Sequence, residues 1–212
     1  AKNYKFFTAK TTRLLTQQSS VIVQGEGTSS MAWISKPGIW AGGVNCLSAQ
    51  AKQYLVGGSA DVTSKSRLLV INAGLSSSIV DVITYSEGAA FKKSITIGKN
   101  QSTSLNLVSL APGAKSVAMQ VIPRTGRVVS YLVDERGKGL QSLGGDVVNS
   151  QAAPSKLLLI PGIAHSKTSK SHLLRILNPS IASAVVTVEV LSKDGRYIPV
   201  GLDGRRAGAG KV

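Results

Sequence analysis

The sequence predicts an all-β protein made of two tandem antiparallel β-sandwich domains of the immunoglobulin-like type. Three observations predict it: short segments that alternate apolar and polar residues, turn-forming residues about every ten positions, and a pattern that occurs twice. The chain has 212 residues, which is room for one large domain or for two of about 100 residues. Hydrophobic residues make up 42% and charged residues 17%, so we expect a folded chain rather than a disordered basic tail.

An internal repeat organises the chain. Asn72 and Asn178 lie 106 residues apart, and each ends a run of aliphatic residues that a Ser- and Ala-rich turn follows. The matching segments are 68–72 with 173–178, 54–58 with 158–162, 42–43 with 144–145, and, more weakly, 20–24 with 116–120. The chain is therefore about two periods long, and it opens with the back half of a repeat and closes with the front half of another.

Residues 40–150 hold one complete repeat, which we expect to form a complete sandwich. Its apolar residues recur with a period of two, as Val117, Met119 and Val121 do, which is typical of a strand with one buried face. Gly, Ser, Pro or Asn separate the segments, and at most one helical turn is expected, at residues 48–52. The predicted strands are 54–56, 67–71, 79–85, 94–97, 104–108, 116–122 and 127–133.

The two ends of the chain each supply half of a second sandwich. Residues 157–212 predict strands at 157–160, 173–177, 185–191 and 197–200, and residues 1–33 predict strands at 4–7, 13–15, 21–24 and 31–33. Four strands alone would leave an open edge and an exposed apolar face. We therefore expect residues 1–33 to pair with residues 157–212. The alternative closure is exchange with a neighbouring chain, which would make a dimer or a fibre.

The turn motifs resemble those of an actinobacterial family of secreted or envelope-associated proteins that is catalogued only as a domain of unknown function. The resemblance covers most of residues 40–205. It is carried by Tyr54-Leu55-Val56-Gly57-Gly58, Leu68-Leu69-Val70-Ile71-Asn72, Leu110-Ala111-Pro112-Gly113, Gly144-Gly145, Leu159-Ile160-Pro161-Gly162 and Leu177-Asn178-Pro179. This chain departs from the family pattern at Ala73-Gly74, where the family tends to have Pro-Gly. The resemblance implies a β-architecture and a location outside the cytoplasm, and it carries no catalytic residues across.

Residues that could do chemistry are few. His165 and His172 share one loop with two lysines, and without a third ligand or a carboxylate they make a poor metal site. Cys46 is the only cysteine, which excludes an internal disulfide. The ten acids are scattered and no Gly-x-Ser-x-Gly elbow occurs, so we expect no enzyme and no cofactor. Asn72 and Asn178 are interpreted as turn residues rather than as a repeated ligand-binding amide.

The formal net charge of +15 is the strongest global signal. It favours salt-sensitive binding to polyanions, such as anionic cell-wall polymers or lipid headgroups. The spread of the basic residues and the scarcity of aromatics argue against a specific nucleic-acid groove. Candidate polyanion contacts are Lys167, Lys170, Arg205 and Arg206 in loops. Trp33 and Trp40 could form a platform for a sugar, but large aromatics more often plug a core or a domain junction.

Three functions remain open at this point. The first is a non-catalytic structural or adhesive protein of the bacterial envelope or the extracellular space, which self-associates or binds other envelope proteins. The second is a carbohydrate- or polyanion-binding module that uses the basic loops. The third is a hydrolase whose site residues lie far apart in the sequence. No apolar run reaches the roughly 18 residues that a membrane span needs, and residues 1–25 contain no apolar segment typical of a signal peptide.

Overall fold

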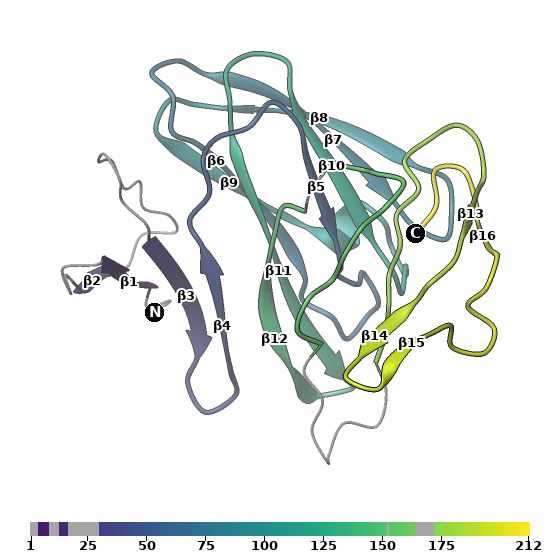
Figure 1. Cartoon of the computed structure of the whole chain (residues 1–212). Helices are drawn as coiled ribbons and strands as arrows, with labels where there is room; N and C mark the ends of the chain where they lie inside the picture. The colour runs from purple at the N-terminus through teal and green to yellow at the C-terminus, as the bar shows by residue number, and fades with distance from the viewer. Residues whose placement is uncertain (1–3, 9–12, 17–29, 152, 164–171) are drawn as a thin grey trace.

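The computed structural model describes residues 4–8, 13–16, 30–151, 153–163 and 172–212 (Figure 1). They form an all-β structure whose strands pair antiparallel, as the sequence predicted. The short helix among them is a 3-10 turn at Leu107–Ser109. The expected helical turn at 48–52 is absent from these residues, and Gln50 there forms a single β-bridge with Val128.

Two four-stranded sheets face each other and make a β-sandwich. One sheet has the order β5-β10-β7-β8 and the other the order β12-β11-β6-β9. Their bounds are β5 Gln53–Val56, β6 Arg67–Asn72, β7 Ser78–Tyr85, β8 Phe91–Ile97, β9 Gln101–Asn106, β10 Ala118–Pro123, β11 Val129–Lys138 and β12 Gln141–Asn149. The seven strands predicted for this region correspond to β5 through β11.

The core lies between these two sheets because alternate residues of each strand point inward. Leu68 and Val70 of β6 and Val80 and Val82 of β7 are fully buried, and Leu55 of β5 joins them. Burying such a side chain completely stabilises the fold by about 1.5–3 kcal/mol. Complete burial of each of these aliphatic side chains requires both sheets, because each side chain lies in the space between them.

A third four-stranded sheet precedes the sandwich and has the same strand arrangement as the β12-β11-β6-β9 sheet. Its order is β2-β1-β3-β4, with β1 Tyr4–Thr8, β2 Arg13–Thr16, β3 Ser30–Lys36 and β4 Trp40–Asn45. Gly43 of β4 pairs with Trp33 of β3, just as Gly145 of β12 pairs with Glu135 of β11. The β3–β4 hairpin thus repeats the β11–β12 hairpin 102 residues earlier, and β1 and β2 take the places that β6 and β9 hold in the sandwich.

We use the name C-terminal unit for residues 153–163 and 172–212. Its strands are β13 Ala184–Val186, β14 Val190–Ser192, β15 Gly195–Tyr197 and β16 Arg205–Ala207, and they pair as β13–β16 and β14–β15. The predicted strands 157–160 and 173–177 are not assigned as strands, and the predicted strand 185–191 is split between β13 and β14.

The register of the C-terminal unit repeats that of the sandwich. Val190 pairs with Tyr197 in β14–β15, and the residues 106 positions earlier, Thr84 and Phe91, pair in β7–β8. Asn178 forms a β-bridge with Lys211, which matches the pairing of Asn72 with Gln101 in β6–β9. The C-terminal unit is therefore a second copy of the β6–β9 part of the sandwich, without strands equivalent to β10, β11 and β12 among the described residues.

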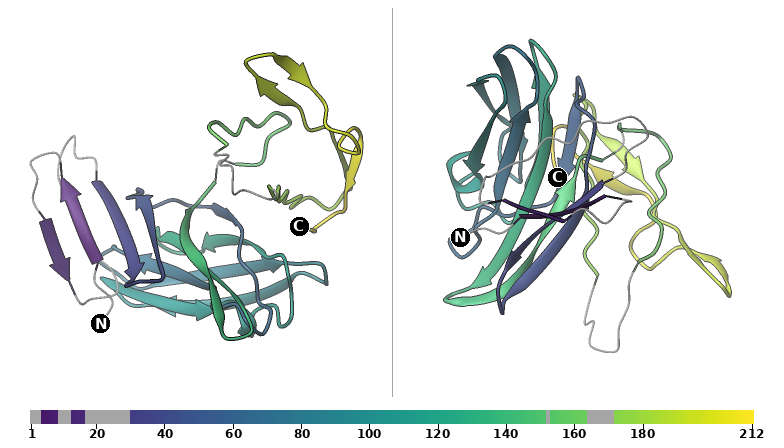
Figure 2. Two further views of the ribbon diagram at one scale, coloured as in Figure 1. Left: turned by 90° about the horizontal axis from the view of Figure 1, so that it is seen from below. Right: turned by 90° about the vertical axis from the view of Figure 1, so that its left-hand side faces the viewer.

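The expected pairing of residues 1–33 with residues 157–212 does not occur among the described residues. β1, β2 and β3 pair with one another and with β4, whereas the strands of the C-terminal unit pair among themselves. Figures 1 and 2 show the N-terminal sheet and the C-terminal strands on opposite sides of the sandwich. Strands that pair in a local hairpin close a short loop, which costs less conformational entropy than closing the long loop between the two ends of the chain. The predicted strand 21–24 lies outside the described residues, and the division into domains 40–150 and 1–33 plus 157–212 stays a prediction.

Candidate functional site

The C-terminal unit exposes residues whose repeat equivalents form the core. Leu159, Leu174 and Ile176 correspond to Leu55, Leu68 and Val70 of the sandwich. These three sandwich side chains have an exposed fraction of 0%, whereas Leu159, Leu174 and Ile176 are 75%, 42% and 37% exposed. The sandwich residues are buried between the two facing sheets, which β10 and β11 complete by pairing with β5, β6 and β7. The described residues of the C-terminal unit include no strands equivalent to β10 and β11, and the corresponding side chains are exposed to solvent.

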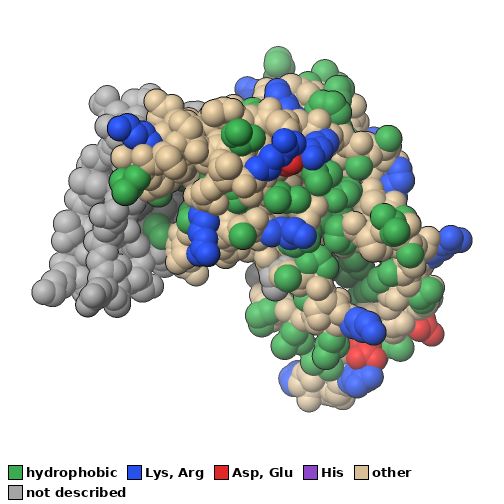
Figure 3. Space-filling model, turned by 90° about the horizontal axis from the view of Figure 1, so that it is seen from above, with side chains coloured by type: hydrophobic (Ala, Val, Ile, Leu, Met, Phe, Trp, Pro, Cys, Tyr) green, Lys and Arg blue, Asp and Glu red, His purple; other side chains and the backbone are tan. Residues whose placement is uncertain are grey.

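We call this region the open apolar surface. It consists of the exposed large aliphatic residues of the C-terminal unit: Leu157, Leu158, Leu159, Ile160, Ile163, Leu173, Leu174, Ile176, Ile181, Val185, Leu191, Ile198 and Val200. In Figure 3, hydrophobic side chains gather in the lobe at the lower right, on the side where Figure 1 shows the C-terminal strands. Exposed apolar surface of this extent is characteristic of protein interaction sites.

The opposite side of the same segment faces the sandwich. Arg175 and Leu177, which alternate with Leu174 and Ile176, are half-buried. The Arg175 Nε atom lies 3.4 Å from the Ser116 Oγ atom, and burial lowers the pKa of the Arg175 guanidinium. The C-terminal unit thus docks through its outer face and presents its core-type face to solvent.

Two equivalent asparagines shape the turns of the repeats. The Asn72 side-chain amide donates to the carbonyl oxygens of Ser76, Ile97 and Gly98 at 2.8–3.1 Å, and its Oδ1 accepts from the Gly74 N–H at 2.9 Å. These partners lie in the turn that joins β6 to β7, at the last residue of β8 and in the turn that follows β8. The predicted turn role of Asn72 therefore accounts for its whole side chain.

Asn178 repeats this arrangement in the C-terminal unit. Its amide donates to the Ala182 and Ala207 carbonyl oxygens at 2.8 and 3.1 Å, and its Oδ1 accepts from Ser180. The hydrogen-bonding capacity of both asparagines is used by the chain itself, which confirms the turn interpretation and leaves neither amide for a ligand.

Glycines allow the N-terminal sheet to approach the sandwich closely. A Cβ atom on Gly145 of β12 would lie 2.6 Å from the Trp40 ring, and a Cβ atom on Gly42 of β4 would lie 2.9 Å from the Asp146 backbone. The repeated Gly-Gly pairs of the sequence therefore meet in space. We call this contact between β4 and β12 the glycine contact.

An ion pair closes the glycine contact. The Lys36 Nζ atom lies 2.7 Å from the Glu135 carboxylate, which is only 11% exposed. Burial alone would raise the pKa of the Glu135 carboxyl, but the hydrogen bond from Lys36 and the attraction of its positive charge outweigh burial and lower the pKa. Trp40 therefore fills the junction between β4 and β12 rather than forming an open sugar platform. The Trp33 side chain lies outside the described part of the chain.

The acidic residues of the sandwich hold strands together. Asp134 accepts from Arg136 through both oxygens, at 2.6 and 2.8 Å, and also from Ser66 and the Gly58 N–H. Burial raises the pKa of Asp134, but these hydrogen bonds outweigh it, so the pKa is lowered. The structure thus gives this carboxylate a complete set of partners within the fold.

Asp81 plays a similar part on the outer face of β7. Hydrogen bonds from Arg124, Lys92 and Ser94 hold the pKa of its carboxyl far below its usual range. The three donors come from β8 and from the residue after β10, so the carboxylate ties three neighbouring strands. Among the described residues, no group of three or more His, Cys, Asp and Glu is placed to hold a metal ion.

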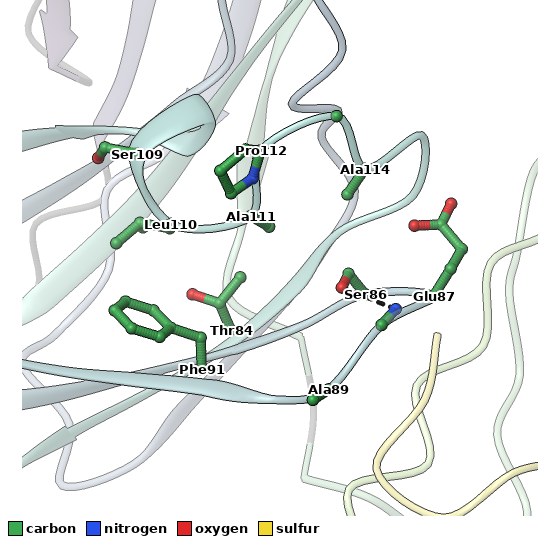
Figure 4. A pocket seen from close by; sticks show the side chains of 12 residues that line it. Thr84, Ser86, Glu87, Ala89, Phe91, Ser109, Leu110, Ala111, Pro112 and Ala114 are labelled. Atoms are coloured by element: carbon green, nitrogen blue, oxygen red, sulfur yellow. Dashed lines mark hydrogen bonds between the residues drawn. The ribbon is translucent and has the colours of Figure 1, made fainter.

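An open depression of about 600 Å³ lies at one end of the sandwich. Phe91 and Thr84 line it on one side and the loop around Pro112 on the other (Figure 4). Lys211 of the C-terminal unit donates to the Glu87 and Gly88 carbonyl oxygens at its rim. The exposed Phe91 ring offers apolar contact, and the Glu87 carboxylate already accepts from the Ser116 N–H at 2.8 Å.

The predicted polyanion contacts are only partly described. Arg205 and Arg206 lie exposed on β16, and the Arg206 guanidinium donates to Ser183 at 3.1 Å. Lys167, Lys170 and His165 lie outside the described residues, so the structure does not test whether they join these arginines. His172 is exposed and Cys46 is half-buried. No helix in the described residues is long and apolar enough to cross a membrane.

Comparison with known proteins gives a family but no activity. A family described as "Family of unknown function (DUF5719)" matches residues 9–212. The chain belongs to this family. No curated protein matches the chain. Among solved structures, the crystal structure of Thermotoga maritima 1070 is similar, with a TM-score of 0.43 and 14% identity over 50% of this chain and 96% of that chain.

Neither the open apolar surface nor the glycine contact was among the features that the sequence predicted. The open apolar surface could have been found by aligning each aliphatic residue of the second repeat with its buried counterpart in the first. The glycine contact had a signal as well, because Gly42-Gly43 and Gly144-Gly145 were recognised as a repeat. Glycines in a strand often mark the close approach of another backbone, which is what these pairs do.

Proposed function

We propose that this chain is a non-catalytic structural or assembly protein of the bacterial cell envelope that acts outside the cytoplasm. Two tandem immunoglobulin-like domains are the finer arrangement that we propose for it. The observation that carries the proposal is the open apolar surface, where Leu159, Leu174 and Ile176 are exposed although their counterparts Leu55, Leu68 and Val70 are fully buried. Association would remove this surface from water.

Sedimentation of the purified chain tests the proposal. An assembly protein should gain mass as its concentration rises from about 1 to about 100 μM, the range in which interfaces of moderate affinity form. Fractionation of the native bacterium should place the protein in the envelope. A chain that remains monomeric over this range, or that is found in the cytoplasm, would contradict the proposal.

A second candidate function is binding of an anionic cell-wall polymer. The net charge of +15 and the exposed Arg205 and Arg206 side chains of β16 support it. The protein should bind to a heparin or teichoic-acid column and elute at a modest salt concentration. The double variant Arg205→Gln/Arg206→Gln should elute at a lower salt concentration than the wild type. Equal elution of the variant and the wild type would exclude β16 as the binding surface.

A further inference from the structure

We propose that the depression at the end of the sandwich binds a neutral pyranose ring of the gluco configuration, in which every ring hydroxyl is equatorial. The depression lies between the β7–β8 turn, residues 86–90, and the loop that leads to β10, residues 110–117. Its volume of about 600 Å³ is within the range of about 300–1,000 Å³ that is typical of small-molecule sites. The inference is independent of the proposed assembly function, because it uses no residue of the open apolar surface.

A buried hydroxyl without a partner lies at the inner end of the depression. Thr84 is 1% exposed and lines the depression, and its Oγ1 atom has no hydrogen-bond partner among the described residues. It lies on the same face of β7 as Val80 and Val82, so it points between the two sheets. The repeat does not require this hydroxyl, because the residue 106 positions later is Val190. An unpaired buried hydroxyl is unfavourable, and a ligand that hydrogen-bonds to it gains affinity.

The walls on either side of this hydroxyl are apolar. The Phe91 ring, 47% exposed, lies on one side, and Leu110, Ala111 and Pro112 lie on the other (Figure 4). The face of an aromatic ring is electron-rich and attracts C–H groups. A pyranose whose hydroxyls are all equatorial presents C–H groups on both faces, so it can contact both walls. An axial hydroxyl would place a polar group against an apolar wall without a hydrogen-bond partner.

The polar edge of the ring would meet oxygen atoms that can still form hydrogen bonds. The Ser86 Oγ accepts from the Gly88 N–H at 3.1 Å and keeps its own proton to donate. The exposed Glu87 carboxylate accepts from the Ser116 N–H through Oε1, which leaves its second oxygen to accept from a sugar hydroxyl. The residues that line the depression include no Lys or Arg, and Lys211 at the rim is bound to carbonyl oxygens. This composition favours a neutral sugar over an anionic one.

A titration of the ¹⁵N-labelled chain with methyl β-D-glucopyranoside, followed by NMR, tests the proposal. Amide shifts should change at residues 84–91 and 109–114, with a dissociation constant on the order of 1 mM, because one stacked ring and a few hydrogen bonds make a weak contact. Methyl β-D-galactopyranoside differs in one hydroxyl, which is axial, and should bind at least about fivefold more weakly. No shift changes with the glucoside up to about 50 mM, or equal binding of the two sugars, would overturn the proposal.

Two variants test the residues that the proposal assigns. Thr84→Val replaces the unpaired hydroxyl with a methyl group of similar size, so the fold should be kept while affinity for the glucoside falls about fivefold or more. Phe91→Ala removes the exposed ring and should weaken binding about tenfold or more. The matched control Thr96→Val changes an exposed threonine near the other end of β8 and should bind as the wild type does. Wild-type affinity in Thr84→Val or in Phe91→Ala would show that the sugar does not occupy this depression.

Discussion

Asn72 stabilises the sandwich through one side chain that serves two turns. It is 1% exposed and its amide contacts three carbonyl oxygens in two separate loops. Alanine at this position would leave those carbonyl oxygens and the Gly74 N–H without their partner. An unsatisfied buried polar group costs about 1–3 kcal/mol.

Asn72→Ala should therefore lower the free energy of unfolding by about 2–4 kcal/mol. Urea denaturation followed by circular dichroism measures it. Asn178 is also buried, at 8% exposed, but its neighbours in the C-terminal unit are largely exposed, so water can reach the carbonyl oxygens that Asn178→Ala leaves unpaired and the effect should be less than half as large. Equal effects of the two substitutions would contradict the expected difference between the closed sandwich and the exposed C-terminal unit.

Asp134 should make the stability of the sandwich depend on pH. The pKa of its carboxyl is lower in the folded chain than the ordinary value of 3.8, because hydrogen bonds from Arg136, Ser66 and Gly58 outweigh burial. A carboxyl whose pKa is lowered by folding contributes stability above its unfolded pKa and loses that contribution as the pH falls through its folded pKa. Its contribution is thus fully present at neutral pH and is lost progressively as the pH falls below about 4.

Urea denaturation at several pH values between 7 and 2 checks this expectation. Asp134→Asn should be less stable than the wild type at pH 7, and the gap between the two should narrow as the pH falls below 4. Ser66→Ala removes one donor and should give an intermediate profile. A constant gap at all pH values would mean that Asp134 stabilises the fold by packing and not by its charge.

The glycine contact determines how closely the strands β4 and β12 can approach each other. A methyl group on Gly145 would clash with the Trp40 ring, and one on Gly42 would clash with the Asp146 backbone. Gly145→Ala should separate β4 from β12, expose Trp40 and shift tryptophan fluorescence to longer wavelengths. Overpacking of this kind costs about 1–3 kcal/mol.

Gly88→Ala is the matched control for this experiment. A Cβ atom there would lie 3.6 Å from the nearest atom, Ser86 Oγ, which is an ordinary contact. Its fluorescence should remain that of the wild type. An unchanged spectrum for Gly145→Ala would show that β4 and β12 can shift without separating.

The strands of the sandwich could be predicted because period-two alternation reports a buried face directly. β6 and β7 carry aliphatic residues on one side, and their bounds differ from the prediction by a residue at most. β12 was missed because Gly144 and Gly145 interrupt the alternation, and glycine is unfavourable in strands. Residues 173–177 alternate as well as β6 does, yet they are not assigned as a strand.

The candidate site could not be predicted in the same way. Leu174 and Ile176 look like core residues in the sequence, and their exposure depends on which strands are present to cover them. Arg205 and Arg206 are candidates because of their charge, and charge alone does not determine which groups lie next to a side chain. The repeat in the sequence aligns the residues of the two copies correctly. Only the strand pairing in the structure shows in which copy the apolar side chains are covered and in which they are exposed.

The charge of the whole molecule separates the two proposed functions. At +15, two copies repel each other at low salt, and screening shortens that repulsion from a range of about 30 Å at 0.01 M to about 3 Å at 1 M. Apolar association should therefore strengthen as salt is raised from about 50 to about 500 mM, whereas polyanion binding should weaken. Sedimentation and heparin retention, measured across the same salt series, should move in opposite directions.

The hairpin of the C-terminal unit also shows where this architecture tolerates extra length. Tyr197 and Arg205 are eight residues apart, but the equivalent Phe91 and Ile95 of β8 are four apart, and the pairings on either side keep the same register. The four additional residues are absorbed between β15 and β16 without disturbing either ladder. The 198–204 loop is thus a natural position for grafting an epitope or a fluorophore, which would allow the protein to be followed in living cells while every strand keeps its partner.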